Sequence, residues 1–218
     1  MTGWLALTKD QRRETLRQAA RTSGISPKAI EKDWWVTLVL RALFEGPYTS
    51  FMIFKGGTSL SKCWNLIERF SEDIDIALEP NAFGMRYKTA PTKGDIERLK
   101  RQGCAFISKE LKEVLEGRLA RMGVPAGAIT IGAEKVDEKM PDKDPQVLLV
   151  GYQSLYEVNH YFKDEVKVEV SVRSLKEPYS FRAIQSILST FFPNEVYMEA
   201  PLDIPVVDPK KTWSARLP

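Results

Sequence analysis

Two stretches of the sequence alternate for most of their length between polar and apolar residues: EDIDIAL at 72–78 and EVKVEVSVRS at 165–174. Alternation with a period of two predicts β-strands, and it decides which side chains share a face. In the first strand, Asp73 and Asp75 lie on one face. The second strand places four valines on one face, and its other face carries Lys167, Glu169, Ser171 and Arg173. Burial of the valines leaves this other face free for polar work.

Helical signals precede the first of these strands. Residues 8–22 are rich in good helix formers, and a second helix is predicted over 26–46. In the second helix Ser26 is the expected N-cap, Pro27 takes the first helical position and Gly46 ends the helix. The apolar residues Ile30, Trp34 and Leu38 follow at helical spacing, so we expect the tryptophans of this helix to be core residues.

The remaining segments mix helical and extended patterns. FMIF (51–54) predicts a short strand, and TSLSKCWNLIERF (58–70) has helical spacing. Residues 95–122 predict a long charged helix, or a pair of helices broken near Gly103. Further along we expect a loop at 137–145, a strand at 146–156, a short amphipathic helix at 181–192 and an extended segment at 200–213. The mixture predicts an α+β (mixed α/β) fold.

Composition excludes few functions. A formal net charge of +3 over 218 residues permits a nucleic-acid partner without arguing for one. No window reaches the ~18 apolar residues of a membrane span, and the N-terminus lacks the features of a signal peptide, so we expect a cytoplasmic protein with no membrane partner. Two cysteines and one histidine, without a CxxC pair, favour reduced thiols over a zinc site.

Carboxylates on the predicted strands suggest a metal site. Two aspartates at i and i+2 on one strand, Asp73 and Asp75, can bridge metal ions ~3.5–4 Å apart. Magnesium prefers oxygen ligands and keeps water and phosphates in its shell, which suits nucleotidyl or phosphoryl transfer. Glu169, on the polar face of the second strand, is the natural third ligand.

The turn KGGTS, formed by residues 55–59, supplies a second candidate element. Its glycines let the backbone approach phosphates closely, the hydroxyls of Thr58 and Ser59 add donors, and a helix N-terminus follows. Neither element is specific alone, because a DID strand is often only a polar face and a GG pair often only a turn. A strand–turn–helix–strand unit without chemistry therefore stays an alternative. A restriction-type nuclease is another, although such enzymes commonly place the lysine two residues after the acid, whereas Lys167 precedes Glu169.

The stretch FKGGTSLSKCWNLIERFSEDIDIAL (54–78) resembles the signature of the AbiEii/AbiGii-type nucleotidyltransferase toxins, which belong to the DNA polymerase β-like minimal nucleotidyltransferase superfamily. The pattern of that family is a Gly-Gly-Thr/Ser turn, a helix and then RFSEDID. The resemblance continues in IEKDWWVTLVLRAL before this stretch and in VKVEVSVRS, IQSIL and DIPVVDPKKTW after it. It covers roughly residues 28–213, with 84–140 poorly matched.

The resemblance implies roles for individual residues. Asp73, Asp75 and Glu169 match the metal-binding carboxylates, and Ser71 matches a serine beside the active centre, which makes these four the candidate catalytic residues. The nucleotide-binding residues implied by the turn are Lys55, Gly56, Gly57, Thr58 and Ser59. Lys167 and Arg173 are candidates for contacting phosphates or the acceptor.

The resemblance also implies a fold and an activity. The fold is a small mixed sheet flanked by helices. The cofactor is Mg²⁺, two ions, the substrate is a nucleoside triphosphate (NTP), and the acceptor is the 3′ end of tRNA or a protein. The protein would be the toxin of a toxin–antitoxin system in abortive infection (phage defence), paired with a cognate antitoxin. A homologue without catalysis, acting as a nucleotide-, RNA- or protein-binding module, stays an alternative.

The expected domain organisation is a single nucleotidyltransferase-like domain over 1–218. It comprises N-terminal helices (1–46), the motif core (51–78), a helical insertion (84–140) and the second acidic strand region (146–213). The family commonly continues past PERTFWEK into a C-terminal helical region, whereas this sequence reads PKKTWSARLP. We therefore expect that helical region to be absent.

Overall fold

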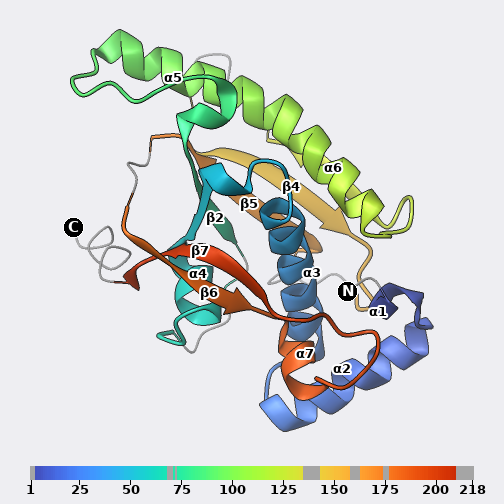
Figure 1. Ribbon diagram of the computed structural model, residues 1–218. Coiled ribbons are helices and arrows are strands. Elements are labelled where there is room, and N and C mark those ends of the chain that lie inside the picture. The colour runs from blue at the N-terminus through green and yellow to red at the C-terminus, as the bar shows by residue number, and fades with distance from the viewer. Residues whose placement is uncertain are drawn as a thin grey trace.

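The computed structural model describes residues 3–67, 71, 73–134, 143–157, 163–173 and 177–209 (Figure 1). Its helical elements are α1 (Gly3–Ala6), α2 (Lys9–Ser23), α3 (Pro27–Phe44), η1 (Thr49–Phe51), α4 (Gly56–Lys62), η2 (Pro80–Phe83), α5 (Lys93–Phe106), η3 (Ile107–Leu111), α6 (Lys112–Arg121) and α7 (Ile187–Phe191). Its strands are β1 (Met52–Lys55), β2 (Ile74–Leu78), β3 (Ile129–Ala133), β4 (Gln146–Tyr152), β5 (Glu165–Ser171), β6 (Tyr179–Ile184) and β7 (Leu202–Val207). No helix within these ranges has the length and apolar character needed to cross a bilayer.

The described strands pair into one seven-stranded sheet in the order β3-β4-β5-β2-β1-β7-β6. β2 runs parallel to β5 and antiparallel to β1, while β1 runs parallel to β7; the other neighbouring pairs are antiparallel. In Figure 1, α5 and α6 follow one another along one side of the molecule, and α3 crosses its centre. The predicted mixed α/β fold class is confirmed.

α3 forms the centre of the core. The Ser26 side chain accepts the N–H of Ala29 and Pro27 occupies the first helical position, as the sequence predicts. Trp34 is 0% exposed and Trp35 3% exposed, which confirms both tryptophans as core residues. A helix that is apolar on most of its circumference is stable only when surrounded by other elements, and α3 is buried along nearly its whole length.

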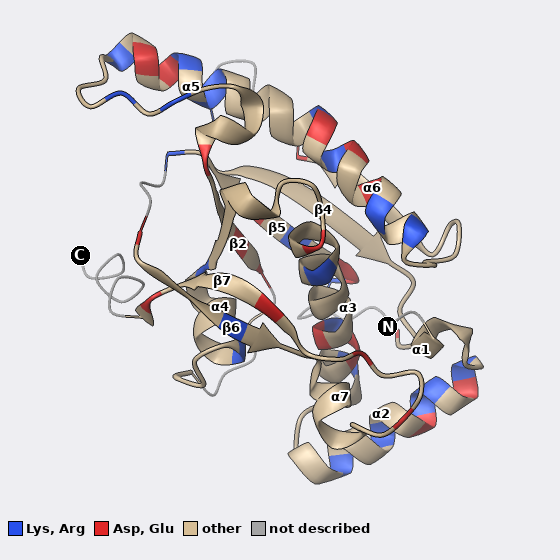
Figure 2. Ribbon diagram, viewed as in Figure 1, with Lys and Arg blue, Asp and Glu red and all other residues tan. Residues whose placement is uncertain are grey.

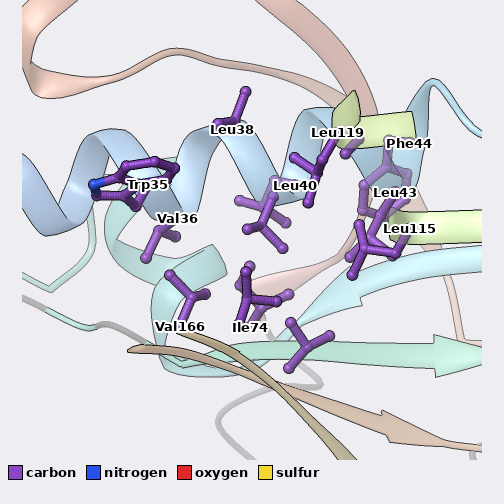
Figure 3. Packing of buried hydrophobic residues seen from close by; sticks show 14 of the residues in the cluster. Trp35, Val36, Leu38, Leu40, Leu43, Phe44, Ile74, Leu115, Leu119 and Val166 are labelled. Atoms are coloured by element: carbon purple, nitrogen blue, oxygen red, sulfur yellow. The ribbon is translucent and has the colours of Figure 1, made fainter. Parts of the chain in front are cut away.

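The core lies between α3, the sheet and α6. Figure 3 shows side chains of α3 meeting side chains of β2, β5 and α6 in one continuous cluster. Contacting residues from the four elements include Val36, Leu40, Ile74, Val166 and Leu119. Packing on this side leaves the opposite face of β2 and β5 to carry polar residues.

The helix predicted over 58–70 is shorter than expected. α4 begins at Gly56 and ends at Lys62, and residues 68–70 lie outside the described residues. Asn65 has a φ of 51°, in the left-handed region that interrupts a right-handed helix. The apolar spacing through Trp64 reflects packing onto the core rather than continued helix.

The helix predicted over 181–192 is wrong in its first half. β6 covers Tyr179–Ile184 and pairs antiparallel with β7, and the helix begins only at Ile187, where the Ser186 side chain caps it. Partnership with β7 overrides the local helical spacing here. The strand β3 was not predicted; it forms the opposite edge of the sheet and pairs with β4.

The charged region predicted as a helix or helix pair over 95–122 is a continuous helical run, in which α5 and α6 are joined by the π-helical segment η3. Gly103 does not break it. An added Cβ at Gly103 would lie 2.7 Å from Val172 Cγ1, so this glycine lets α5 approach the end of β5 closely.

Candidate active site

Three neighbouring strands align the first candidate residues. The register of β1 against β2 pairs Lys55 with Asp75, and the register of β2 against β5 pairs Asp75 with Glu169. Residues paired in this way project from the same face of a sheet. Since the intervening Ile74 and Val168 are fully buried on the other face, the three polar side chains lie on the face away from α3.

The glycine turn lies directly against one of these carboxylates. Gly56 has a φ of +79°, and a Cβ added to it would lie 1.9 Å from Asp75 Oδ2. No side chain fits in so short a space, and the left-handed conformation disfavours any residue but glycine. The first glycine of the turn is therefore required both by its own backbone and by the Asp75 carboxylate beside it.

Hydroxyls hold the turn and the start of β2 together. The Thr58 hydroxyl, 1% exposed as a residue, donates to the Asp73 carbonyl and lies 2.9 Å from Ser71 Oγ. The Ser59 hydroxyl donates to the Gly56 carbonyl at 2.8 Å. These two hydroxyls, predicted as donors to phosphates, are occupied within the motif, so they shape the turn and position the backbone that carries Asp73.

A lysine lies among the carboxylates. Lys167 Nζ is 2.5 Å from Glu169 Oε1, with side-chain exposures of 40% and 26%. The hydrogen bond that Lys167 donates to Glu169 raises the pKa of Lys167, and the charges of Asp73 and Glu134 raise it further. The ammonium is thus protonated at neutral pH and close enough to Asp73 to sense its charge. Asp73 precedes β2 and is exposed.

The donor chemistry of this group suits a hard cation. Asp75 and Glu169 supply carboxylate oxygens from adjacent strands, and the Gly56 turn forms a cradle against Asp75 that a Cβ would fill. Over the described residues, no group of three or more His, Cys, Asp and Glu side chains forms a complete metal site. The carboxylate oxygens of Asp75 and Glu169 are of the ligand type that magnesium prefers.

One predicted residue lies elsewhere. Arg173 follows β5 and is exposed, and it lines a separate pocket of about 380 Å³ together with Tyr87, Lys88 and Arg98. The structure therefore brings Lys55, the turn, Asp75, Glu169 and Lys167 together, with Asp73 directly before β2, and it leaves Arg173 beyond the end of β5.

A pocket next to the turn contains residues that the sequence did not single out. It has a volume of about 550 Å³ and is lined by Ser71 and by the ion pair between Lys62 Nζ and Asp33 Oδ1, which are 2.6 Å apart. The only signal in the sequence was charge inside the otherwise apolar α3. Burial raises the pKa of the Cys63 thiol in this pocket to about 12, so the thiol is a poor nucleophile at neutral pH.

A mixed sheet with carboxylates on adjacent strands, and a glycine turn against one of them, is an arrangement suited to phosphoryl or nucleotidyl transfer. The family model described as "Nucleotidyl transferase AbiEii toxin, Type IV TA system" matches residues 38–213. The chain therefore belongs to the AbiEii family and is a nucleotidyltransferase toxin of a type IV toxin–antitoxin system. No curated protein sequence matches the chain.

Membership confirms the resemblance drawn from the sequence and implies a nucleotidyltransferase fold. It also implies an NTP substrate and an antitoxin partner. The matched range includes every site residue predicted from the sequence, from Lys55 to Arg173.

Proposed function

We propose that this toxin transfers a nucleoside monophosphate from an NTP to an acceptor hydroxyl, on the 3′ end of a tRNA or on a protein, in abortive infection, with Mg²⁺ held by Asp73, Asp75 and Glu169. The observation that carries the proposal is the register that pairs Asp75 with Glu169 while the Gly56 turn lies against the Asp75 carboxylate. The described strands form a single sheet, which supports the organisation of the chain as one catalytic domain.

Different residues of the chain have different roles in such a reaction. When bound, magnesium neutralises phosphate charge and orients the triphosphate for in-line attack. The glycine backbone at Gly56 and Gly57 admits phosphates close to the main chain. The Thr58 hydroxyl fixes the backbone of Asp73, and the protonated Lys167 offers positive charge beside the carboxylates, where negative charge develops on the phosphate oxygens.

Concave space adjoins these residues. The pocket of about 550 Å³ reaches Ser71, whose hydroxyl contacts Thr58 in the turn. Ligand sites are commonly pockets of this size with a few polar groups. The nucleoside of the NTP is placed here in our proposal, with its phosphates toward Gly56.

The decisive experiment replaces Asp75 by Asn. Asp75→Asn keeps the shape of the side chain but removes a charged metal ligand, so we expect transfer to fall by about 10³-fold or more. Four labelled NTPs, total tRNA and magnesium are incubated with the protein, and label is read on both RNA and protein. Asp203→Asn, an exposed carboxylate on β7 of the same sheet, is the matched control and retains activity. Transfer that persists in Asp75→Asn with an unchanged melting temperature would contradict the proposal.

A second function is favoured by the ion pair between Lys167 and Glu169, which engages the third carboxylate. A catalytically silent homologue would bind the nucleotide without transferring it to an acceptor. Calorimetry with an NTP, with and without magnesium, separates the two: magnesium-dependent binding without labelled product supports the silent homologue, and binding with product supports the transferase.

A further inference from the structure

One short segment of the chain carries a high positive charge. Residues 84–101 hold six Lys or Arg and two Asp or Glu, a net charge of +4, whereas the whole chain has a net charge of only +3. The rest of the protein is therefore slightly acidic. In Figure 2, Lys and Arg gather on the first half of α5 and on the connection that leads into it. We call the side chains of Arg86, Tyr87, Lys88, Arg98 and Arg173 the basic surface.

The basic surface lines the pocket of about 380 Å³ noted above. Arg86, Arg98 and Arg173 are exposed, and none of the three has a hydrogen-bond or ion-pair partner among the residues that the structure describes. The acid in the pocket, Asp95, is already engaged by Lys88 Nζ at 2.6 Å and by the cap of α5. Three guanidinium groups thus line one hollow, and no acid in the described part of the chain forms an ion pair with them.

The basic surface is fixed to the strand that carries Glu169. The Tyr87 hydroxyl donates to the Val172 carbonyl at 3.0 Å, while the residue as a whole is 37% exposed. α5 also approaches Val172 through Gly103, as described above. Arg173 lies four residues beyond Glu169, which is about 13 Å along an extended strand. This is a distance that the last few nucleotides of a single strand can cover.

We propose that the basic surface binds the sugar–phosphate backbone of a single-stranded RNA 3′ end and leads its terminal hydroxyl toward Asp75 and Glu169. The inference rests on the proposed function and names its acceptor. Unneutralised Arg side chains suit phosphates, and an exposed aromatic ring beside them suits base stacking, the combination typical of single-strand binding. An acidic protein would satisfy the charges but would give the Tyr87 ring no base to stack on.

The test measures RNA binding without catalysis. The triple variant Arg86→Gln/Lys88→Gln/Arg98→Gln is compared with Lys9→Gln/Arg17→Gln/Arg21→Gln, which removes the same charge from exposed positions of α2. The probe is a 5′-fluorescein-labelled single-stranded oligoribonucleotide with a free 3′ hydroxyl, followed by anisotropy over a series of KCl concentrations. We expect the first variant to bind the oligoribonucleotide at least about tenfold more weakly. The slope of the logarithm of its binding constant against the logarithm of the KCl concentration should decrease in magnitude by about 2, because each lost phosphate contact accounts for about 0.7. The α2 variant should stay within about twofold of the unaltered protein.

Two further readouts separate this inference from the proposed function. NTP binding by calorimetry should be equal in both triple variants, because neither touches the Gly56 turn. Equal RNA affinity of the two variants, or label transferred to protein by a chain that does not bind the oligoribonucleotide, overturns the inference and leaves the nucleotidyltransferase intact. RNA binding that is lost only in the first variant supports the inference even if no NTP is ever consumed, and in that case the proposed function alone fails.

Discussion

Two groups of carboxylates in this protein look alike in the sequence and differ in the fold. On α3, Glu31 accepts the Ser154 hydroxyl at 2.7 Å and the Leu155 N–H at 2.9 Å, and it is 2% exposed. Asp33, also buried at 5% exposed, accepts the Ile187 N–H at 2.7 Å and pairs with Lys62. Glu31 thus connects the central helix to the segment after β4, and Asp33 connects it to α7 and α4.

The carboxylates of the sheet have a different setting. Asp75 and Glu169 are only partly buried, and they project from the face of β2 and β5 that α3 does not cover. A buried charge must be neutralised by the protein itself, whereas a partly exposed charge at a hollow can exchange its partners for a ligand. The comparison teaches that burial, more than residue type, separates acids that hold this fold together from acids suited to chemistry.

The largest expected effect comes from replacing the lysine that pairs with a carboxylate in each of the two groups. Lys62→Met leaves the Asp33 carboxylate buried without its cation, and removing one partner of a buried pair costs about 3–5 kcal/mol of unfolding free energy. Lys167→Met removes the partner of a partly exposed carboxylate and should cost less than about 1 kcal/mol. Urea denaturation of both variants, monitored by tryptophan fluorescence, measures the difference.

Each variant of this pair is a control for the other, since both exchange a carboxylate-bound lysine for methionine. Equal losses of stability would show that exposure does not distinguish the two groups. Lys167→Met should in addition weaken NTP binding or transfer, because it removes the positive charge beside the proposed phosphate site.

A smaller effect is expected from a substitution of Gly56 in the glycine turn. Gly56→Ala and Gly24→Ala both place a side chain on a backbone with positive φ, +79° and +72°, which costs about 1–2 kcal/mol each. A Cβ at Gly24 meets nothing within 4 Å, whereas one at Gly56 collides with Asp75. We therefore expect Gly56→Ala alone to lower transfer, by about 10²-fold, because Asp75 must move.

Thermal melting and the labelled-nucleotide assay, run on both glycine variants, provide the measurement. If Gly24→Ala lowered transfer as much as Gly56→Ala, the loss would come from general instability, and the close approach of the turn to Asp75 would have no catalytic meaning.

Strong local patterns made much of this fold predictable. The alternation around Asp75 and Glu169 and the cap at Ser26 each follow from a short stretch of sequence, and the structure confirms β2, β5 and α3. The edge strands β6 and β3 were missed because partners distant in sequence, β7 and β4, decide their conformation. Local periodicity carries no information about such partners.

The candidate site divides in the same way. Residue types and the motif were sufficient to select Asp73, Asp75 and Glu169, but only the parallel pairing of β2 with β5 places Asp75 beside Glu169. That pairing spans a long crossover, so no local rule gives its register. The occupied hydroxyl of Thr58 and the buried Asp33 also depend on tertiary contacts.

The smallest expected effect is the change of stability with pH that the buried Glu31 causes. Burial raises the pKa of Glu31, although its hydrogen bonds from Ser154 and Leu155 and the charge of Arg12 act in the opposite direction. Between the ordinary Glu pKa of about 4.3 and the raised value, the folded protein holds more protons than the unfolded chain. The contribution of Glu31 to stability is thus greatest below this window and falls as pH rises through it.

The variant Glu31→Gln cannot ionise and keeps an oxygen that accepts the Leu155 N–H. The unfolding free energy of the unaltered protein should therefore decline relative to that of the variant as pH rises across the window. Above the window the difference should level off. Urea denaturation of both proteins at a series of pH values measures this difference in unfolding free energy. A difference that shifted in favour of the unaltered protein as pH rises would contradict the prediction. It would mean that the hydrogen bonds and Arg12 outweigh burial and that Glu31 is an ordinary ionised carboxylate although it is buried.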